Sequence, residues 1–227
     1  MDLILALDVN NTTEAYRLAD QTADSVDLFK VGLELFTREG PELVRNLRND
    51  GHRIMLDLKL HDIPNTVAEA VRSCCDLGVE LLTLHATGGP AMIEAAAEAR
   101  EREGSDTKLL PVTVLTSMNQ EQLIAIGIDR SPADQVLRLA SMALQAGAQG
   151  LVCSPMELES LRQHHGQSPH LVTPGIRPAG SSVDDQQRIA TPAAAKTWGA
   201  SAIVVGRPIR KATHPNQAAQ HIKDMCR

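Results

Sequence analysis

The densest group of charged residues lies in the stretch Asp57-Leu58-Lys59-Leu60-His61-Asp62. Side chains alternate across a β-strand, so Asp57 and Lys59 should share one face about 7 Å apart, with the leucines on the other. The same pattern also occurs on the polar face of a half-exposed antiparallel strand. Here the strand is expected inside a sheet, and a third charge, Asp62, follows it. Buried charges are costly unless they are paired or used, so we favour a catalytic charged array.

A second group of polar residues follows the last two predicted strands. Gly175-Ile176-Arg177 and Gly206-Arg207 each end an apolar run, and Gln186 lies in the loop between them. Backbone N–H groups and an arginine fork are typical donors to a phosphate, and many barrels bind phosphate at this place. The alternative is an arginine that only faces solvent. We accept it for Arg188 and Arg210, and we predict that Arg207 binds phosphate.

Polar residues also end the other predicted strands, where Leu, Ile and Val fill the preceding positions. Asp8 lies at the end of the first predicted strand and Lys30 at the end of the second. Thr116 and Ser117 end the fifth, where their hydroxyls either orient a polar ring or make a turn, and the sequence leaves this open. His85 ends the fourth, and for it we favour a structural role over entry into the site.

Eight short apolar runs alternate with segments of helical periodicity. The clearest helix follows Ser131-Pro132 and ends before Gly147, with the cap, first-turn proline and terminal glycine that helices favour. Continuous apolar strands are typical of a parallel sheet covered by helices, and eight of them indicate a single-domain α/β fold over residues 1–227, a (β/α)8 TIM barrel. A doubly wound open sheet is the main alternative, although no G-x-G-x-x-G follows the first strand. The predicted strands are Leu3–Val9, Leu28–Leu33, Arg53–Leu60, Leu81–Ala86, Leu109–Thr116, Gly150–Ser154, Leu171–Gly175 and Ala202–Arg207.

Composition excludes several classes of protein. The 227 residues carry a net charge of −6 and only 2% aromatic residues, which argues against nucleic-acid binding. No apolar stretch approaches the ~18 residues of a membrane span, so we expect no membrane association and a cytoplasmic location. The four cysteines form no C-x-x-C pair. Asp57 and Asp62 could be considered Mg²⁺ ligands, but Lys59 between them supplies the counter-charge, so we predict no metal.

The motifs together resemble the orotidine 5'-phosphate decarboxylase family. The block from Asp57 to Thr66, DLKLHDIPNT, is the most specific part of the resemblance. Further matching pieces lie in family order from the first strand to the eighth, so the resemblance covers essentially the whole chain. They are LALD at 5–8, KVG at 30–32, PVTVLTS at 111–117, TPGIRP at 173–178 and VGRP at 205–208. Thr87 stands where we would expect serine, which affects no catalytic residue.

The resemblance implies loss of CO2 from orotidine 5'-phosphate without a cofactor, giving uridine 5'-phosphate in pyrimidine biosynthesis. By the same resemblance, Lys59 protonates C6 of the ring, Asp57 lies close to the departing carboxylate, and Lys30 holds Asp57 and a ribose hydroxyl. The family is a homodimer in which Asp62 reaches into the partner subunit's site. The implied substrate contacts are Asp8 to ribose, Thr116 and Ser117 to the base, Arg177, Gln186, Gly206 and Arg207 to phosphate, with Ile63 and Thr66 as further contacts.

Two other functions fit part of the pattern. A metal-dependent sugar-phosphate decarboxylase or aldolase on a similar barrel can also use a D-x-K strand, but it would need an acidic metal site. A phospho-ligand sensor could keep the barrel and lose the chemistry. The intact set of Lys30, Asp57, Lys59 and Asp62 argues against a sensor, since simple binding does not require this charge density.

Overall fold

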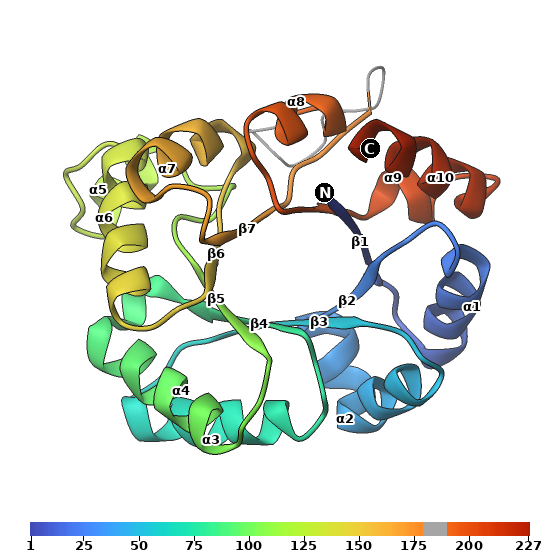
Figure 1. Ribbon diagram of the computed structural model, residues 1–227, viewed down its shortest axis with the longest axis horizontal. Coiled ribbons are helices and arrows are strands. Elements are labelled where there is room, and N and C mark those ends of the chain that lie inside the picture. The colour runs from blue at the N-terminus through green and yellow to red at the C-terminus, as the bar shows by residue number, and fades with distance from the viewer. Residues whose placement is uncertain (179–189) are drawn as a thin grey trace.

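The chain folds into a closed ring of eight parallel strands surrounded by helices, as the computed structural model shows (Figure 1). The structure describes residues 1–178 and 190–227. Each strand pairs with the next along the chain, and β8 closes the ring on β1. The predicted (β/α)8 barrel is therefore confirmed, and the open doubly wound sheet is excluded. The strands are β1 Asp2–Ala6, β2 Leu28–Gly32, β3 Ile54–Leu60, β4 Leu81–His85, β5 Lys108–Val112, β6 Gly150–Val152, β7 His170–Thr173 and β8 Ala202–Val205.

Helices follow the strands and cover the outside of the ring. The α-helices are α1 Thr12–Thr22, α2 Leu33–Asn49, α3 Pro64–Cys75, α4 Pro90–Arg102, α5 Gln120–Ala125, α6 Pro132–Gln145, α7 Leu158–His165, α8 Pro192–Thr197, α9 Arg207–Arg210 and α10 Pro215–Cys226, with 3-10 turns at Ala86–Gly88 and Pro155–Glu157. In α6 the Ser131 side chain accepts from the Asp134 N–H, as its sequence predicts. No helix in the described part of the chain is long and apolar enough to span a membrane.

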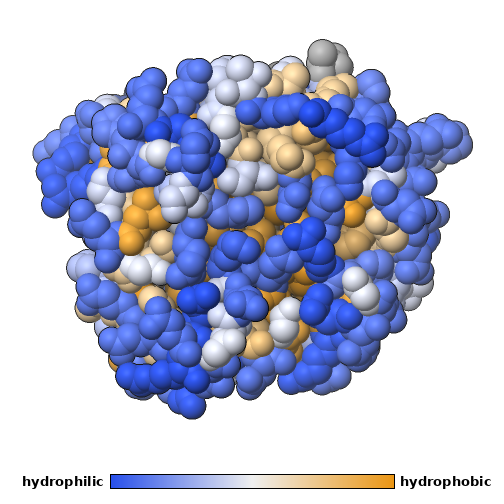
Figure 2. All heavy atoms as spheres, viewed as in Figure 1, coloured by the Kyte–Doolittle hydropathy of each residue, from blue (hydrophilic) through white to orange (hydrophobic). Residues whose placement is uncertain are grey.

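The apolar core has two parts, because strand residues alternate between the inside and the outside of the barrel. Leu3 and Leu5 of β1 pack outward against the helices, whereas Ile4 and Ala6 point inward. The inward set fills the barrel and includes Leu28, Met55, Leu81, Leu110, Val172, Ala202 and Val204. Hydrophilic residues cover most of the molecular face seen in Figure 2. The barrel interior is thus a packed floor beneath the strand ends, not a channel.

Several strands end earlier than their apolar runs. The first regular strand stops at Ala6 and the fifth at Val112, although their buried residues continue to Val9 and Val114. Leu7 and Thr113 still donate backbone hydrogen bonds to the Lys30 and Val152 carbonyls of the neighbouring strands. Leu7, Val9 and Val114 are part of the core outside the barrel. The predicted strands were correct in number and order, but the predicted carboxyl ends were too long for every strand except β3, which ends at Leu60 as predicted.

Candidate active site

A cavity of about 480 Å³ opens at the carboxyl ends of the strands. Its floor is the upper layer of the barrel interior, with Ala6, Met55, Val152 and Val204 among its lining residues. Its charged wall consists of two carboxylates, two lysines and three arginines among the described residues: Asp8, Asp57, Lys30, Lys59, Arg177, Arg207 and Arg210. A polar ligand with an anionic group would fit such a wall.

Asp8, Lys30, Asp57 and Lys59 form a chain of alternating charge, which we call the charged array. Lys30 Nζ lies 3.0 Å from Asp8 Oδ1 and 3.4 Å from Asp57 Oδ2. Lys59 Nζ lies 2.8 Å from Asp57 Oδ1. The four side chains come from the ends of β1, β2 and β3, which are neighbours in the ring. The structure thus brings together the four charged residues that the sequence predicted at the first three strand ends.

Local backbone features make room for the array. Gly32 lies opposite Asp57 in the pairing of β2 with β3, and a β-carbon there would come within 2.8 Å of Lys30 Nζ. Lys59 has a φ of 52°, and its pairing with β4 shifts register between Leu56 and Leu60. Positive φ is uncommon for residues other than glycine, and such strain is concentrated at functional sites. The end of β3 is therefore irregular where the ammonium group projects into the cavity.

Burial and charge act in opposite directions on the two innermost groups. Burial alone would lower the pKa of Lys30, but Asp57 and Asp8 raise the pKa above its ordinary value. Burial would raise the pKa of Asp57, but Lys30 and Lys59 lower the pKa below its ordinary value, with help from the Thr83 hydroxyl. Both groups are therefore ionised at neutral pH, and each holds the other in place.

Thr83 is a part of the site that the sequence reasoning missed. It lies in the middle of β4 and is fully buried. Its hydroxyl donates to Asp57 Oδ1 at 2.9 Å and accepts from the Lys59 N–H at 2.9 Å. One hydroxyl thus supports both the carboxylate and the strained residue beside it. A polar residue within the apolar run LLTL was the available signal.

The arginines of the cavity wall follow β7 and β8. Arg177 is buried, and its Nη1 donates to the Ile176 carbonyl at 2.8 Å. Gly206 precedes α9, and both Gly206 and Arg207 line the cavity. The predicted surface position of Arg210 is wrong: the short turn of α9 brings it back to the cavity wall. Gln186 and Arg188 lie outside the described residues.

The remaining predicted residues are divided between the cavity and the surface. Thr116 lines the cavity, whereas Ser117 is exposed beside it. Asp62, Ile63 and Thr66 are exposed and are not among the described lining residues. Asp62 Oδ1 accepts from the Ile63 N–H at 2.7 Å.

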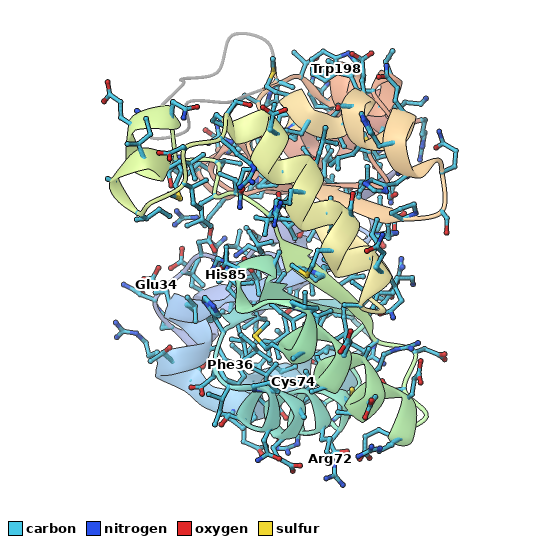
Figure 3. All side chains as sticks on the ribbon, turned by 90° about the vertical axis from the view of Figure 1, so that its left-hand side faces the viewer. Glu34, Phe36, Arg72, Cys74, His85 and Trp198 are labelled. Atoms are coloured by element: carbon cyan, nitrogen blue, oxygen red, sulfur yellow. The ribbon has the colours of Figure 1, made fainter. Side chains whose placement is uncertain are left out.

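His85 lies at the end of β4 and packs its ring against His61, with the ring centroids 5.4 Å apart. Burial lowers the pKa of His85, and the neighbouring His61 lowers this pKa further to a smaller extent. Figure 3 shows His85 and Glu34, which lies in the first turn of α2, toward the same end of the barrel. His85 is not one of the described cavity-lining residues, so the structure agrees with a packing role.

A barrel with paired lysines and aspartates at one end of its strands and arginines after β7 and β8 is typical of enzymes that act on phosphorylated substrates. Comparison with known proteins narrows this class. The family model described as "Orotidine 5'-phosphate decarboxylase / HUMPS family" matches residues 1–222, and the chain belongs to this family.

Several named relatives are similar over nearly the whole chain. An orotidine 5'-phosphate decarboxylase of Mannheimia succiniciproducens is 49% identical over 97% of this chain and 94% of its own length. An orotidine 5'-phosphate decarboxylase of Haemophilus ducreyi is 50% identical over 94% of this chain and 93% of its own length. The crystal structure of orotidine 5'-phosphate decarboxylase from Lactobacillus acidophilus superposes with a TM-score of 0.88 at 40% identity, covering 99% of this chain and 98% of that one.

Proposed function

We propose that the protein decarboxylates orotidine 5'-phosphate to uridine 5'-phosphate and CO2 without a cofactor, as a step of pyrimidine biosynthesis. The family and the printed activity of its relatives support the reaction. The observation that supports the chemistry best is the charged array, which fixes the Lys59 ammonium 2.8 Å from a buried carboxylate.

Breaking the bond between C6 and the carboxylate leaves an electron pair on C6. An ammonium group aimed at that carbon stabilises the developing charge more than it stabilises the substrate. Lys59 then gives its proton to C6 and is reprotonated from water, so the overall reaction consumes one proton. Asp57, beside the departing carboxylate, is held ionised by Lys30 and Lys59 and need not move during the reaction.

Binding groups surround this centre. Asp8 and Lys30 would hold ribose hydroxyls, Thr116 and Ser117 would face the base, and Ile63 and Thr66 would complete the pocket. Arg177, Gln186, Gly206 and Arg207 would bind the phosphate, with Gln186 lying outside the described residues. Phosphate contacts far from the ring can supply binding energy that orients the reacting carbon.

The site is expected to be shared between two subunits. His61–Thr66 is exposed throughout, and Ile63 is 66% exposed, directly after the strand that carries Lys59. An exposed apolar residue beside a charged cavity suits an interface with a second copy. We propose a homodimer in which Asp62 enters the site of the partner subunit.

The activity is tested by following the ultraviolet absorbance of orotidine 5'-phosphate with purified protein in excess EDTA. We expect loss of the orotate signal and formation of uridine 5'-phosphate, because two ammonium groups already supply the counter-charge of Asp57. Turnover that appears only after Mg²⁺ is added would favour a metal-dependent enzyme. Nucleotide binding without turnover under either condition would favour a sensor.

A further inference from the structure

Arg210 is a charged residue at the cavity wall with no role in the function proposed above. It is half-buried at the end of α9, three residues after Arg207, and both line the cavity. Its backbone N–H donates to the Gly206 carbonyl at 3.0 Å, which ties the residue to the loop after β8. Residues three apart on a helical turn lie on neighbouring positions of one face.

The Arg210 side chain has an unused donor. Its Nε is shielded from solvent, and no group in the described part of the chain accepts a hydrogen bond from it. Nor does any described carboxylate form an ion pair with its guanidinium. The two carboxylates of the cavity wall are instead engaged by Lys30 and Lys59. A shielded donor without a partner is unfavourable unless a ligand supplies the acceptor.

We propose that Arg210 is a third guanidinium for the phosphate group of the substrate, beside Arg177 and on the same turn of α9 as Arg207. This inference rests on the proposed function and concerns the same cavity. The ligand class is a phosphate monoester, whose dianion offers three oxygens to charged donors. Two guanidinium groups on one turn can each donate to a different oxygen, and charge-assisted bonds of this type are the strong ones.

The neighbouring residue provides a matched control. Lys211 follows Arg210 directly and carries the same charge, but it is exposed and is not among the described lining residues. Arg210→Gln and Lys211→Gln therefore change the net charge equally, and only the first removes a donor from the cavity. Arg210→Lys keeps the charge and removes the fork.

The experiment measures kcat and KM for orotidine 5'-phosphate, together with the Kd of uridine 5'-phosphate and of uridine. For Arg210→Gln we expect KM and the Kd of uridine 5'-phosphate to rise about 10- to 100-fold, the size of one charge-assisted contact. The Kd of uridine, which has no phosphate, should be unchanged. Arg210→Lys should be intermediate, and Lys211→Gln should stay within about twofold of the wild type.

Equal KM and Kd values in Arg210→Gln and Lys211→Gln would overturn the assignment. So would an equal loss of uridine affinity in Arg210→Gln, because that result would indicate a packing defect. The binding measurements test the role of Arg210 independently of the proposed decarboxylase activity. A wild-type protein that binds uridine 5'-phosphate through Arg210 but does not decarboxylate the substrate would contradict the proposed function alone. A wild type that binds no nucleotide would overturn both.

Discussion

At the residue scale, Asp57 connects the site, since three side chains from three strands contact its carboxylate. Lys30 and Lys59 pair with it, and Thr83 donates a hydrogen bond to it. Removing one partner of a buried polar group leaves the others unsatisfied, which costs more than the bond itself contributes. Substitutions around Asp57 should therefore affect stability and activity together.

Thr83→Val tests this coupling with little change of shape. The variant removes the donor to Asp57 and the acceptor for the Lys59 N–H. We expect a loss of about 1–3 kcal/mol in the free energy of unfolding and a lower kcat. Urea unfolding and steady-state kinetics measure both, and Thr83→Ser, which keeps the hydroxyl, should restore most of the activity. A valine variant that matches the wild type in both measurements would contradict the role.

The charged array also predicts how stability depends on pH. The pKa of Asp57 is lowered in the folded protein, so its contribution is complete above the unfolded value of about 4 and is lost as the pH falls through the folded value. The pKa of Lys30 is raised, so its contribution is complete below about 10 and is lost as the pH rises through its folded value. The contribution of the array should be constant between these limits.

Urea unfolding of the wild type and of Asp57→Asn across this range measures the effect. The asparagine side chain does not ionise, so the difference in unfolding free energy between the two proteins should narrow below about pH 4. A difference that stays constant down to the acid unfolding of the wild type would show that Asp57 does not stabilise the fold through its charge.

The sequence identified part of the site at this scale. Asp8, Lys30, Asp57 and Lys59 could be predicted because each interrupts an apolar run near a strand end. Thr83 was missed because threonine is common in strands and its partners come from β3, which pairs with β4 only in the folded ring. Arg210 was misplaced because a four-residue helix turns it back toward the cavity, and sequence patterns do not fix such short turns.

At the element scale, the end of β3 positions the ammonium group of Lys59 at the cavity. Lys59 takes a positive φ of 52°, a conformation that costs a residue with a β-carbon on the order of 1–3 kcal/mol. The sequence predicted the strand and its facing side chains, since alternation depends only on the period of two. It could not predict the register shift, which arises where β3 meets β4 around the Thr83 hydroxyl.

Two variants that lack the Lys59 ammonium group separate the cost of the backbone strain from the effect of the charge. Lys59→Gly and Lys59→Ala both remove the ammonium group, but only glycine tolerates the positive φ without a steric cost. We expect the glycine variant to be more stable by about 1 kcal/mol in urea unfolding. An alanine variant of equal or greater stability would show that the strand end relaxes once the lysine is gone.

At the scale of the whole molecule, the barrel assigns separate tasks to its two sides. The charged array comes from β1, β2 and β3, with the Thr83 hydroxyl of β4 beneath it, and the loops after β7 and β8 hold the arginines. In the ring of Figure 1, β7 lies opposite β3, whereas β8 adjoins β1, so the two sides meet where β8 pairs with β1. The sequence predicted this arrangement because eight strands in chain order form the ring. Two points stay predictions: that residues 1–227 form one domain, and that the protein is cytoplasmic.

Subunit mixing tests the proposed dimer. If Asp62 enters the partner's site, random pairing of Asp62→Ala and Lys59→Ala subunits gives half heterodimers, each with one intact site, so about a quarter of all sites recover activity. Mixing Asp57→Ala with Lys59→Ala is the control, because those residues belong to one subunit's array and no intact site can form. No recovery in the first mixture would contradict a shared site.

The most direct measurement compares orotidine 5'-phosphate turnover by the wild type and by Lys59→Ala, with the binding of uridine 5'-phosphate measured for both. The account predicts that the wild type releases CO2 and forms uridine 5'-phosphate. The variant should still bind this nucleotide, because the proposed phosphate contacts come from the loops after β7 and β8, but its kcat should fall by many orders of magnitude. Ordinary turnover by Lys59→Ala would contradict the proton donor and the mechanism built on it.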